Sequence, residues 1–334
     1  MRRSKVPVII ISPAVRDANN GNWHTAYRWS RFLRERYRVS LATEWSGVGG
    51  GASPQCMIAL HARRSAASIA RFAQAQAGRP LIVVLTGTDL YRDIRSDASA
   101  RRSLELATHL VVLQDEGIHE LAPGLRRKCR TIYQSAPRLS RGTPSRRTFD
   151  AVLVGHMRPE KDPLTPMRAL QRLAPDSRVR LIHIGEALDE AYLRAARELQ
   201  ARAWPTLKRY LWLGNRPRAE TRQRIRRSHV MVLSSVIEGG ANVVVEAVTA
   251  GVPVLASRIP GNVGMLGRDY AGYFPPGDAP ALAALLERAS RDRRFLSALC
   301  AQCARRAPLF SPARERREAV RLLAEATHSR KEAA

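Results

Sequence analysis

Short apolar runs alternate with amphipathic stretches along the first 140 residues. Apolar runs without polar alternation are typical of strands buried on both faces of a parallel sheet. The run Val6 to Ile11 is of this kind, and further strands are expected at Arg38 to Ala42, Met57 to Leu60, Pro80 to Leu85 and Ala107 to Leu113. Helices are expected from about Trp23 to Arg36 and from Ser65 to Ala77. Strands that alternate with helices predict a doubly wound α/β sheet.

The alternation is interrupted at Pro137 to Thr148 and then resumes. This segment contains two Pro, one Gly and four Arg with little apolar content, which is typical of a linker. Strands are expected beyond it at Phe149 to Val154, Val179 to Ile184, Tyr210 to Leu213, Val230 to Leu233 and Pro253 to Ser257. Helices are expected at Pro163 to Leu173, Leu188 to Ala203, Arg218 to Arg227, Asn242 to Ala250, Ala279 to Arg306 and Pro312 to Ala326.

Two α/β series joined by a linker predict two doubly wound, Rossmann-like domains. We expect the first at residues 1–140 and the second at 149–307, with a C-terminal helix in 308–334 that packs back toward the first domain. Ligands of open α/β sheets bind at the carboxyl ends of the strands. We therefore expect a nucleotide-binding enzyme whose ligand occupies a cleft between two facing domains.

The composition is that of a globular protein and argues against several classes. Of the 334 residues, 45% are hydrophobic and 25% are charged, which is too apolar for a disordered chain. Four cysteines are too few for a disulfide scaffold. The apolar runs are far shorter than the roughly 18 residues of a membrane helix, and the run after the basic N-terminus is too short for a signal sequence. We expect a cytoplasmic protein without stable membrane insertion.

The net charge of +27 arises from 51 Arg and only five Lys, set against 29 acidic residues. Three interpretations stand: a nucleic-acid or membrane-surface binder, a solvated basic surface, and a basic cleft that concentrates small anionic substrates. The Arg residues are scattered along the chain and no nucleic-acid-binding motif accompanies them. This distribution favours the solvated surface, and no nucleic-acid partner is expected.

Cationic residues follow the expected strand Phe149 to Val154. Residues 155–162 read GHMRPEKD and place Arg158 and Lys161 three apart, just past the end of that strand. A guanidinium offers a planar fork of donors and an ammonium offers a compact charge, and both suit a diphosphate. On spacing alone, ordinary surface charge in a loop between a strand and a helix explains these two residues equally well.

The strongest motif, Ser234 to Ala247, reads SSVIEGGANVVVEA and follows another expected strand. Its two glycines permit close approach of the backbone to a ligand. The helix expected from Asn242 would direct its free amides and the positive end of its dipole at an anion. Glu238 and Glu246 have the spacing Glu-x7-Glu, and a carboxylate is the natural acceptor for a pair of sugar hydroxyls.

Followed by Ala-Gly-Val-Pro-Val at 250–254, this motif resembles the donor-site signature of family 4 glycosyltransferases of the GT-B fold. Residues 155–161 resemble the paired Arg/Lys diphosphate clamp of the same family, and the resemblance covers essentially the whole chain. It implies that Glu246 accepts from ribose hydroxyls and that Glu238 faces the donor sugar. The donor-binding residues are then Gly21, Gly155, Arg158, Lys161, Gly214, Glu238, Gly239, Gly240, Ala241, Asn242 and Glu246.

Three loops of the first domain extend the resemblance: Asn19 to His24, Leu60 to Ser65 and Leu85 to Tyr91. With PGNVG at 260–264, they are similar to the selenosugar synthases of selenoneine biosynthesis. These are hexosyltransferases that join the sugar of a UDP-sugar to the selenium of selenophosphate. The similarity implies UDP-N-acetylglucosamine or UDP-glucose as donor, small-molecule substrates, and coupling to other enzymes of that pathway. The alternative is a family 4 enzyme that acts on a hydroxyl of a saccharide or lipid.

The acceptor chemistry is compatible with this similarity. A hydroxyl acceptor normally benefits from a general base, whereas the selenium of selenophosphate is already anionic. Many family 4 members have a His where this chain has Thr86. We expect Arg63 to meet the phosphoryl oxygens with His61 beside it, and His61 joins the expected catalytic group. That group also contains Arg158, Lys161 and Glu238.

Other acceptor-side residues have two interpretations each. Asp89 either orders the Thr86–Gly87 loop or contacts the substrate, and it is kept with His61, Arg63 and Thr86 in the expected acceptor set. Gly21 either caps a helix or approaches the diphosphate. For Arg92 and Arg95, a solvated helix start is favoured.

No metal or cofactor is expected. None of the twelve Asp residues forms an Asp-x-Asp pair, so cationic residues would replace the metal that such a pair holds on a nucleotide-sugar. Cys300 and Cys303 lack the second pair of ligands that a structural zinc site needs. Cys56 and Cys129 are expected to be buried small hydrophobes, and His183 a core residue.

Overall fold

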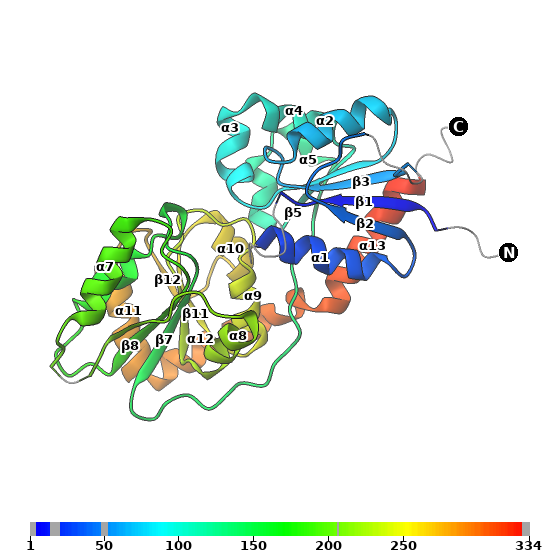
Figure 1. Cartoon of the computed structure of the whole chain (residues 1–334). Coiled ribbons are helices and arrows are strands. Elements are labelled where there is room, and N and C mark those ends of the chain that lie inside the picture. The colour runs from blue at the N-terminus through cyan, green and yellow to red at the C-terminus, as the bar shows by residue number, and fades with distance from the viewer. Residues whose placement is uncertain (1–4, 14–20, 48–52, 206, 329–334) are drawn as a thin grey trace. The chain divides into compact units, whose positions relative to one another are not determined.

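The computed structural model describes residues 5–13, 21–47, 53–205 and 207–328. The chain divides into two compact units. Unit 1 comprises Met1–Gln134 with Pro312–Ala334, and unit 2 comprises Ser135–Ser311. Each unit is built on a six-stranded parallel sheet with helices packed around it (Figure 1).

The sheet of unit 1 has the strand order β2-β1-β3-β4-β5-β6. Its strands are β1 (Pro7–Ile11), β2 (Arg38–Ala42), β3 (Cys56–Leu60), β4 (Leu81–Val84), β5 (His109–Val112) and β6 (Cys129–Thr131). Its helices are α1 (Gly21–Leu33), α2 (Ala66–Ala75), α3 (Ile94–Ser96), α4 (Ala98–Leu106), α5 (Pro123–Arg126) and α13 (Pro312–His328). A π-helical turn at Asp89–Asp93 precedes α3.

Alternate residues of these strands feed two separate apolar cores, one on each face of the sheet. Val8 and Ile10 pack with α1 and α13, whereas Ile9 and Ile11 pack with α2 and α4 (Figure 1). This alternation follows from the period of two in a strand, and it explains why the strands read as unbroken apolar runs.

Glu315 fixes α13 to α1 within unit 1. Its carboxylate is buried and accepts hydrogen bonds from Arg28 Nε at 2.6 Å, Arg28 Nη2 at 2.9 Å and Trp29 Nε1 at 2.9 Å. A buried charge of this kind is tolerated because it is paired and hydrogen-bonded. The C-terminal helix therefore completes one face of the first sheet.

The sheet of unit 2 has the order β12-β11-β10-β7-β8-β9. Its strands are β7 (Phe149–Val154), β8 (Val179–Ile184), β9 (Tyr210–Trp212), β10 (Val230–Leu233), β11 (Val254–Ser257) and β12 (Tyr273–Phe274). Its helices are α6 (Leu164–Leu170), α7 (Glu190–Ala201), α8 (Arg218–Arg227), α9 (Asn242–Thr249), α10 (Pro260–Leu266), α11 (Ala279–Arg291) and α12 (Arg293–Arg306). Helix α6 contacts both α7 and α11, and helix α9 contacts both α8 and α12.

Several elements differ from the sequence expectation. The strands β6 and β12 and the helices α4 and α10 were not expected. β6 and β12 are three and two residues long, too short for a hydrophobic run to mark them. The expected linker, Pro137 to Thr148, lies against unit 2, where Gly142 N–H donates to Arg226 O at 2.8 Å and Arg141 Nη1 to Gly251 O at 3.0 Å.

No helix among the described residues is long and apolar enough to cross a membrane.

Candidate functional site

The strand order of unit 2 brings its two chemical motifs together. From β7 the chain winds outward to β8 and β9, then returns to β10 on the other side of β7. Ligands of doubly wound sheets bind at this point of reversal, outside the carboxyl ends of the strands. Residues 155–161 follow β7, and residues 234–246 follow β10, which pairs with β7. Two segments about 80 residues apart in sequence therefore share one edge of the sheet.

Lys161 and Glu238 form the direct contact between the two motifs. Lys161 Nζ lies 2.5 Å from Glu238 Oε1, and Ser235 Oγ donates to the same oxygen at 2.6 Å. Glu238 is only 7% exposed, so both partners are needed to satisfy its charge. The sequence singled out Lys161 and Glu238 separately, and the structure places them against each other.

Backbone contacts hold the two loops in register. Val236 N–H donates to Glu160 O at 3.0 Å, and Ser234 Oγ donates to the carbonyl oxygens of Lys161 at 3.0 Å and Asp162 at 2.8 Å. Ser234 is fully buried beneath the contact. The loop that carries Lys161 is therefore fixed in place by the loop that carries Glu238.

Arg158 differs from Lys161 in being largely free of the protein. Its side chain is 45% exposed, and its Nε lies 4.0 Å from Glu160. Solvent screens an exposed pair at that distance, so the guanidinium keeps most of its capacity to bind an anion. The pair of cations predicted for a diphosphate thus consists of one that is fixed and one that is exposed.

Two glycines at this edge are required by close backbone approach. A Cβ on Gly261 would lie 1.9 Å from Glu238 O, and a Cβ on Gly185, whose φ is +151°, would lie 1.9 Å from Gly155 O. Any side chain at either position would therefore displace a motif loop. Gly261 lies in the PGNVG segment, but its contact with Glu238 had no sequence signal.

The helix α9 begins where the sequence predicted. Gly239 and Gly240 lead into it, Ala241 is its N-cap residue and Asn242 its first residue. Ala241 has an extended conformation, and no side chain caps the first turn. Free amides at this end, together with the helix dipole, provide a favourable environment for an anion.

Glu246 lies in the second turn of α9 and is bound by arginines that the sequence analysis did not identify. Arg218 donates to Glu246 Oε1 from Nε at 3.0 Å and from Nη2 at 2.8 Å. Arg222 Nε lies 4.0 Å from the same oxygen. Glu246 is 8% exposed, so this pairing accounts for its burial.

Gly214 lies farther along the same edge, in the turn after β9. Its φ of +68° favours glycine, and its carbonyl accepts from Gly185 N–H at 2.9 Å. The structure thus gives Gly214 a conformational role in holding the turn next to the loop after β8.

Two histidines near this edge are held neutral by burial. His183 is fully buried, and burial lowers its pKa to about 4. It hydrogen-bonds Tyr210 Oη at 3.0 Å and Gly155 O at 3.3 Å, as expected of a core residue. Burial also lowers the pKa of His156, although Glu186 opposes the shift. His156 Nδ1 accepts from Glu186 N–H at 3.1 Å.

In unit 1, Asp89 joins the loops that follow β3 and β4. It is 0% exposed, and its carboxylate accepts from the N–H groups of Ala62, Thr86 and Gly87, each at 2.9 Å. Of its two interpretations, loop ordering is the one observed. The carboxylate is buried, and the expected contact between Asp89 and an acceptor stays a prediction.

His61 lies beneath the same loops and is only 3% exposed, with a φ of +71°. Arg64 N–H donates to its Nδ1 at 3.3 Å, so the neutral ring carries its proton on Nε2 and donates to Thr88 Oγ1 at 3.0 Å. Burial lowers the pKa of His61 against the opposing effect of Asp89. These contacts give His61 a positioning role in the loop, and its expected direct role in catalysis stays a prediction.

The remaining acceptor-side residues are more accessible. Thr86 is half-buried, and the Arg63 side chain is 52% exposed with its Nε 3.2 Å from Asp97. Arg92 and Arg95 pair with Asp93 and Glu120 at the surface, in agreement with a solvated helix start. Arg63 is thus the exposed cation of the expected acceptor set.

Gly21 is exposed and is the first residue of α1. The sequence analysis placed it in a loop that continues to His24, whereas residues 21–24 form the first turn of this helix. Its carbonyl accepts from Thr25 Oγ1 at 2.9 Å. Asn19 and Asn20, from the same expected loop, lie outside the described residues.

The four cysteines are free thiols. Cys56, Cys129 and Cys303 are buried, and Cys300 is half-buried on the same helix as Cys303. Within the described part of the chain, no three His, Cys, Asp or Glu side chains are grouped so that they could hold a metal ion.

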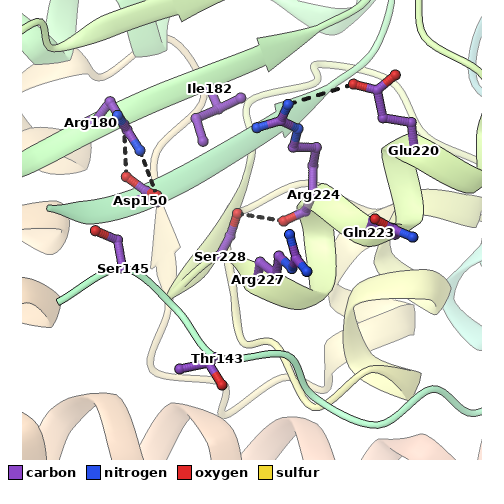
Figure 2. A pocket seen from close by; sticks show the side chains of 10 residues that line it. All are labelled: Thr143, Ser145, Asp150, Arg180, Ile182, Glu220, Gln223, Arg224, Arg227 and Ser228. Carbon is purple, nitrogen blue, oxygen red and sulfur yellow. Dashed lines mark hydrogen bonds and ion pairs between the residues drawn. The ribbon is translucent and has the colours of Figure 1, made fainter.

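A pocket of about 320 Å³ lies at the other edge of the unit 2 sheet, between the amino ends of β7 and β8 and the last turns of α8 (Figure 2). Arg180 donates to both carboxylate oxygens of Asp150 at 2.9 Å, and Arg224 lies 3.6 Å from Glu220. These ion pairs neutralise two cations of its wall. None of the predicted site residues lines this pocket, so the candidate site stays at the carboxyl edge.

Part of the chain matches a known protein family. Residues 142–309 match the family described as glycosyl transferases group 1. The segment covers both motifs of unit 2. No match was found among curated protein sequences.

Among solved structures, the chain is similar to Anabaena HepE (Alr3699) in complex with UDP, at 17% identity over 96% of this chain and 100% of that chain, with a TM-score of 0.77. It is also similar to sucrose-phosphate synthase (tll1590) from Thermosynechococcus elongatus, at 15% identity over 96% of this chain and 99% of that chain, with a TM-score of 0.73. A UDP-forming α,α-trehalose-phosphate synthase from Burkholderia vietnamiensis is similar at 14% identity over 83% of this chain and 75% of that chain, with a TM-score of 0.66. With the two parallel sheets, these similarities show a two-domain Rossmann-like GT-B fold.

Proposed function

Because the chain belongs to the glycosyl transferases group 1 family and is a glycosyltransferase of the GT-B fold, we propose that it is a selenosugar synthase. It transfers a sugar from UDP-N-acetylglucosamine or UDP-glucose to the selenium of selenophosphate and releases UDP. The proposal requires a donor site for a nucleotide-sugar and an acceptor site for a small anion.

The donor side of the proposal is supported by unit 2. HepE was crystallised with UDP and with UDP-glucose. Lys161, Arg158 and the free amides at the start of α9 lie at the carboxyl edge of one sheet. We assign the diphosphate to these groups, the ribose to Glu246 and the sugar to Glu238. Gly155, Gly214 and residues 239–242 contribute backbone contacts, and the assignment of Gly21 to the donor remains a prediction.

The role that we propose for these groups follows from the negative charge that develops on the leaving UDP. Breaking the bond between the sugar and UDP leaves negative charge on the β-phosphate. Preorganised cations and amides that meet the charge as it forms lower the barrier. Lys161 is already fixed by Glu238, whose carboxylate Ser235 also holds, so little reorganisation is needed when the charge appears. We propose that these groups suffice and that no metal is required.

The observation that carries the acceptor assignment is the burial of every candidate base in the expected acceptor set. His61 is 3% exposed and Asp89 is 0% exposed, with its carboxylate bound to backbone amides. Thr86 cannot act as a base near neutral pH. A hydroxyl acceptor would lack the proton acceptor that it normally uses. An acceptor that is already anionic needs only positive charge, which Arg63 offers.

The proposed transfer balances without an oxidant or reductant. A selenium lone pair forms the bond to the anomeric carbon, and the carbon–oxygen bond to UDP breaks with its electron pair leaving on the β-phosphate. The phosphoryl group stays on selenium until water cleaves the selenium–phosphorus bond and releases phosphate. The reaction also requires one enzyme that makes selenophosphate and another that consumes the selenosugar, which is the coupling implied by the resemblance.

The test is an assay of UDP release by the purified chain with each donor, with and without selenophosphate, in the presence of a chelator. We expect UDP release that depends on selenophosphate and a product whose mass spectrum carries the selenium isotope pattern bound to the sugar. The Glu246→Ala variant serves as a control in which the donor KM rises.

Two results would overturn the proposal. Absence of UDP release with every donor would remove the UDP-sugar assignment. Release that depends on a saccharide or lipid hydroxyl and ignores selenophosphate would establish the alternative acceptor instead.

A further inference from the structure

The ion pair between Arg218 and Glu246 is unusual in its geometry. An arginine that meets a carboxylate in fork-to-fork fashion places one donor on each oxygen. Arg218 instead directs both Nε and Nη2 to Oε1, at 3.0 and 2.8 Å, and Arg222 Nε approaches the same atom at 4.0 Å. Among the described residues, no donor reaches Oε2 of Glu246. One carboxylate oxygen is thus saturated and the other retains its two lone pairs.

The position of Arg218 does not serve the stability of its own helix. Arg218 is the first residue of α8, where the helix dipole disfavours a cation. Neighbouring arginines on α8 add to the repulsion, including Arg222 and Arg224. The favourable interaction recorded for Arg218 is its contact with Glu246, 28 residues away on another helix.

We infer that Arg218 is a positioning residue for the nucleoside ribose: it holds Glu246 so that Oε2 faces the 2′- and 3′-hydroxyls of a bound uridine diphosphate. This inference rests on the proposed function, because it takes the ribose of UDP as the partner of Glu246. Arg218 fixes the carboxylate through Oε1 and leaves Oε2 for a pair of hydroxyl donors. Its charge also offsets that of Glu246 close to a doubly charged diphosphate.

The test measures calorimetric Kd values for UDP and for 2′-deoxy-UDP with the full chain and its variants. In Arg218→Ala we expect the Kd for UDP to rise roughly tenfold, because a hydrogen bond to a charged group loses its alignment. The Kd for 2′-deoxy-UDP should rise by a clearly smaller factor, since one of the two hydroxyls that the carboxylate would bind is absent. A residue that only stabilised the fold would weaken both ligands equally.

Two further substitutions complete the test. Arg218→Lys keeps the charge without the two adjacent donors. It should bind UDP with an affinity between those of the wild type and the alanine variant. If Arg218→Ala does not fold, the lysine variant tests the positioning role in its place. Arg224→Ala is the matched control, because Arg224 lies on the same helix with 43% exposure against 40% for Arg218 and pairs with Glu220. We expect this control to bind both nucleotides like the wild type.

Equal weakening of UDP and 2′-deoxy-UDP in Arg218→Ala, or unchanged binding of both, would overturn the role of Arg218 while the proposed function stands. Failure of the wild-type chain to bind UDP at all would overturn the proposed function, and the inference with it.

Discussion

At the scale of single residues, the proposed donor site depends on Lys161, which contacts a buried carboxylate and which we assign to the diphosphate. Its ammonium contacts Glu238 Oε1 at 2.5 Å. The same charge can therefore compensate a buried carboxylate and stabilise a leaving phosphate. Arg158, which is exposed and only distantly paired, is free to follow the diphosphate.

Lys161→Ala and Arg158→Ala should each lower kcat about 10²–10³-fold at saturating donor, because each removes a cation that stabilises charge in the transition state. Steady-state kinetics with UDP detection measures the effect. Lys208→Ala is the control, since Lys208 is an exposed lysine of the same unit. Normal turnover in both site variants would remove these residues from the diphosphate clamp.

The lowered pKa of His183 makes the folding stability of the chain depend on pH. Its pKa is about 4 in the folded chain, below the ordinary value of 6.5, because burial disfavours the charged ring. Between pH 6.5 and about 4 the unfolded chain therefore binds more protons, and stability falls as the pH falls. The shift corresponds to about 3 kcal/mol across that window. Below pH 4 the loss levels off, because the folded form then also takes up the proton.

Urea unfolding at pH 7 and at pH 4.5 should show this loss in the wild type, and His183→Gln should reduce it. Comparing the two proteins isolates His183 from His61, His156 and His229, whose pKa values burial also lowers. An identical pH dependence in the wild type and the variant would contradict the assignment.

Sequence reasoning identified single residues better than their partners. Glu246 was singled out by the spacing of its motif, but Arg218 lies on another helix, and only the packing of α8 against α9 brings the two together. His61 was expected beside Arg63 at an acceptor, and Asp89 was expected either to order its loop or to contact the substrate. The structure buries both, since the loops they support need their hydrogen bonds.

At the scale of elements, buried strands were predicted best. β7 and β10 have the bounds expected from the sequence, because a strand buried on both faces is rich in apolar residues: β10 is wholly apolar, and only Asp150 interrupts β7. The short helix α10 was missed. It contains two glycines and a proline, so its composition indicates a turn, and it forms because the surrounding unit packs against it.

A substitution at Gly261 measures how much α10 contributes to holding the loop of Glu238. A Cβ would lie 1.9 Å from Glu238 O, so Gly261→Ala must displace the loop that holds Glu238. We expect a loss of about 1–3 kcal/mol in the free energy of unfolding, as for other overpacked sites. A rise in the donor KM should accompany it.

Denaturant unfolding and donor kinetics measure the two effects of Gly261→Ala. Gly124→Ala is the matched control, because a Cβ there meets nothing within 4 Å and should neither lower the stability nor raise the donor KM. A Gly261→Ala variant with the stability and donor KM of the wild type would show that the loop adapts without cost.

At the scale of the whole molecule, strand order explains how the motifs come to serve one site. Neither motif alone identifies a donor site, and the spacing of Arg158 and Lys161 equally suits an ordinary surface loop. The order β11-β10-β7-β8 places both motifs at one edge of the sheet. That order could be expected from the alternation of strands and helices together with the family resemblance, whereas the side-chain contacts across the edge could not.

The most direct measurement is a crystal structure of the chain grown with UDP and Mg²⁺. The account predicts the diphosphate within hydrogen-bonding distance of Lys161 and Arg158, the ribose hydroxyls on Glu246, and no cation between nucleotide and protein. A nucleotide bound away from the carboxyl edge of the unit 2 sheet, or held there through a bridging Mg²⁺, would contradict it.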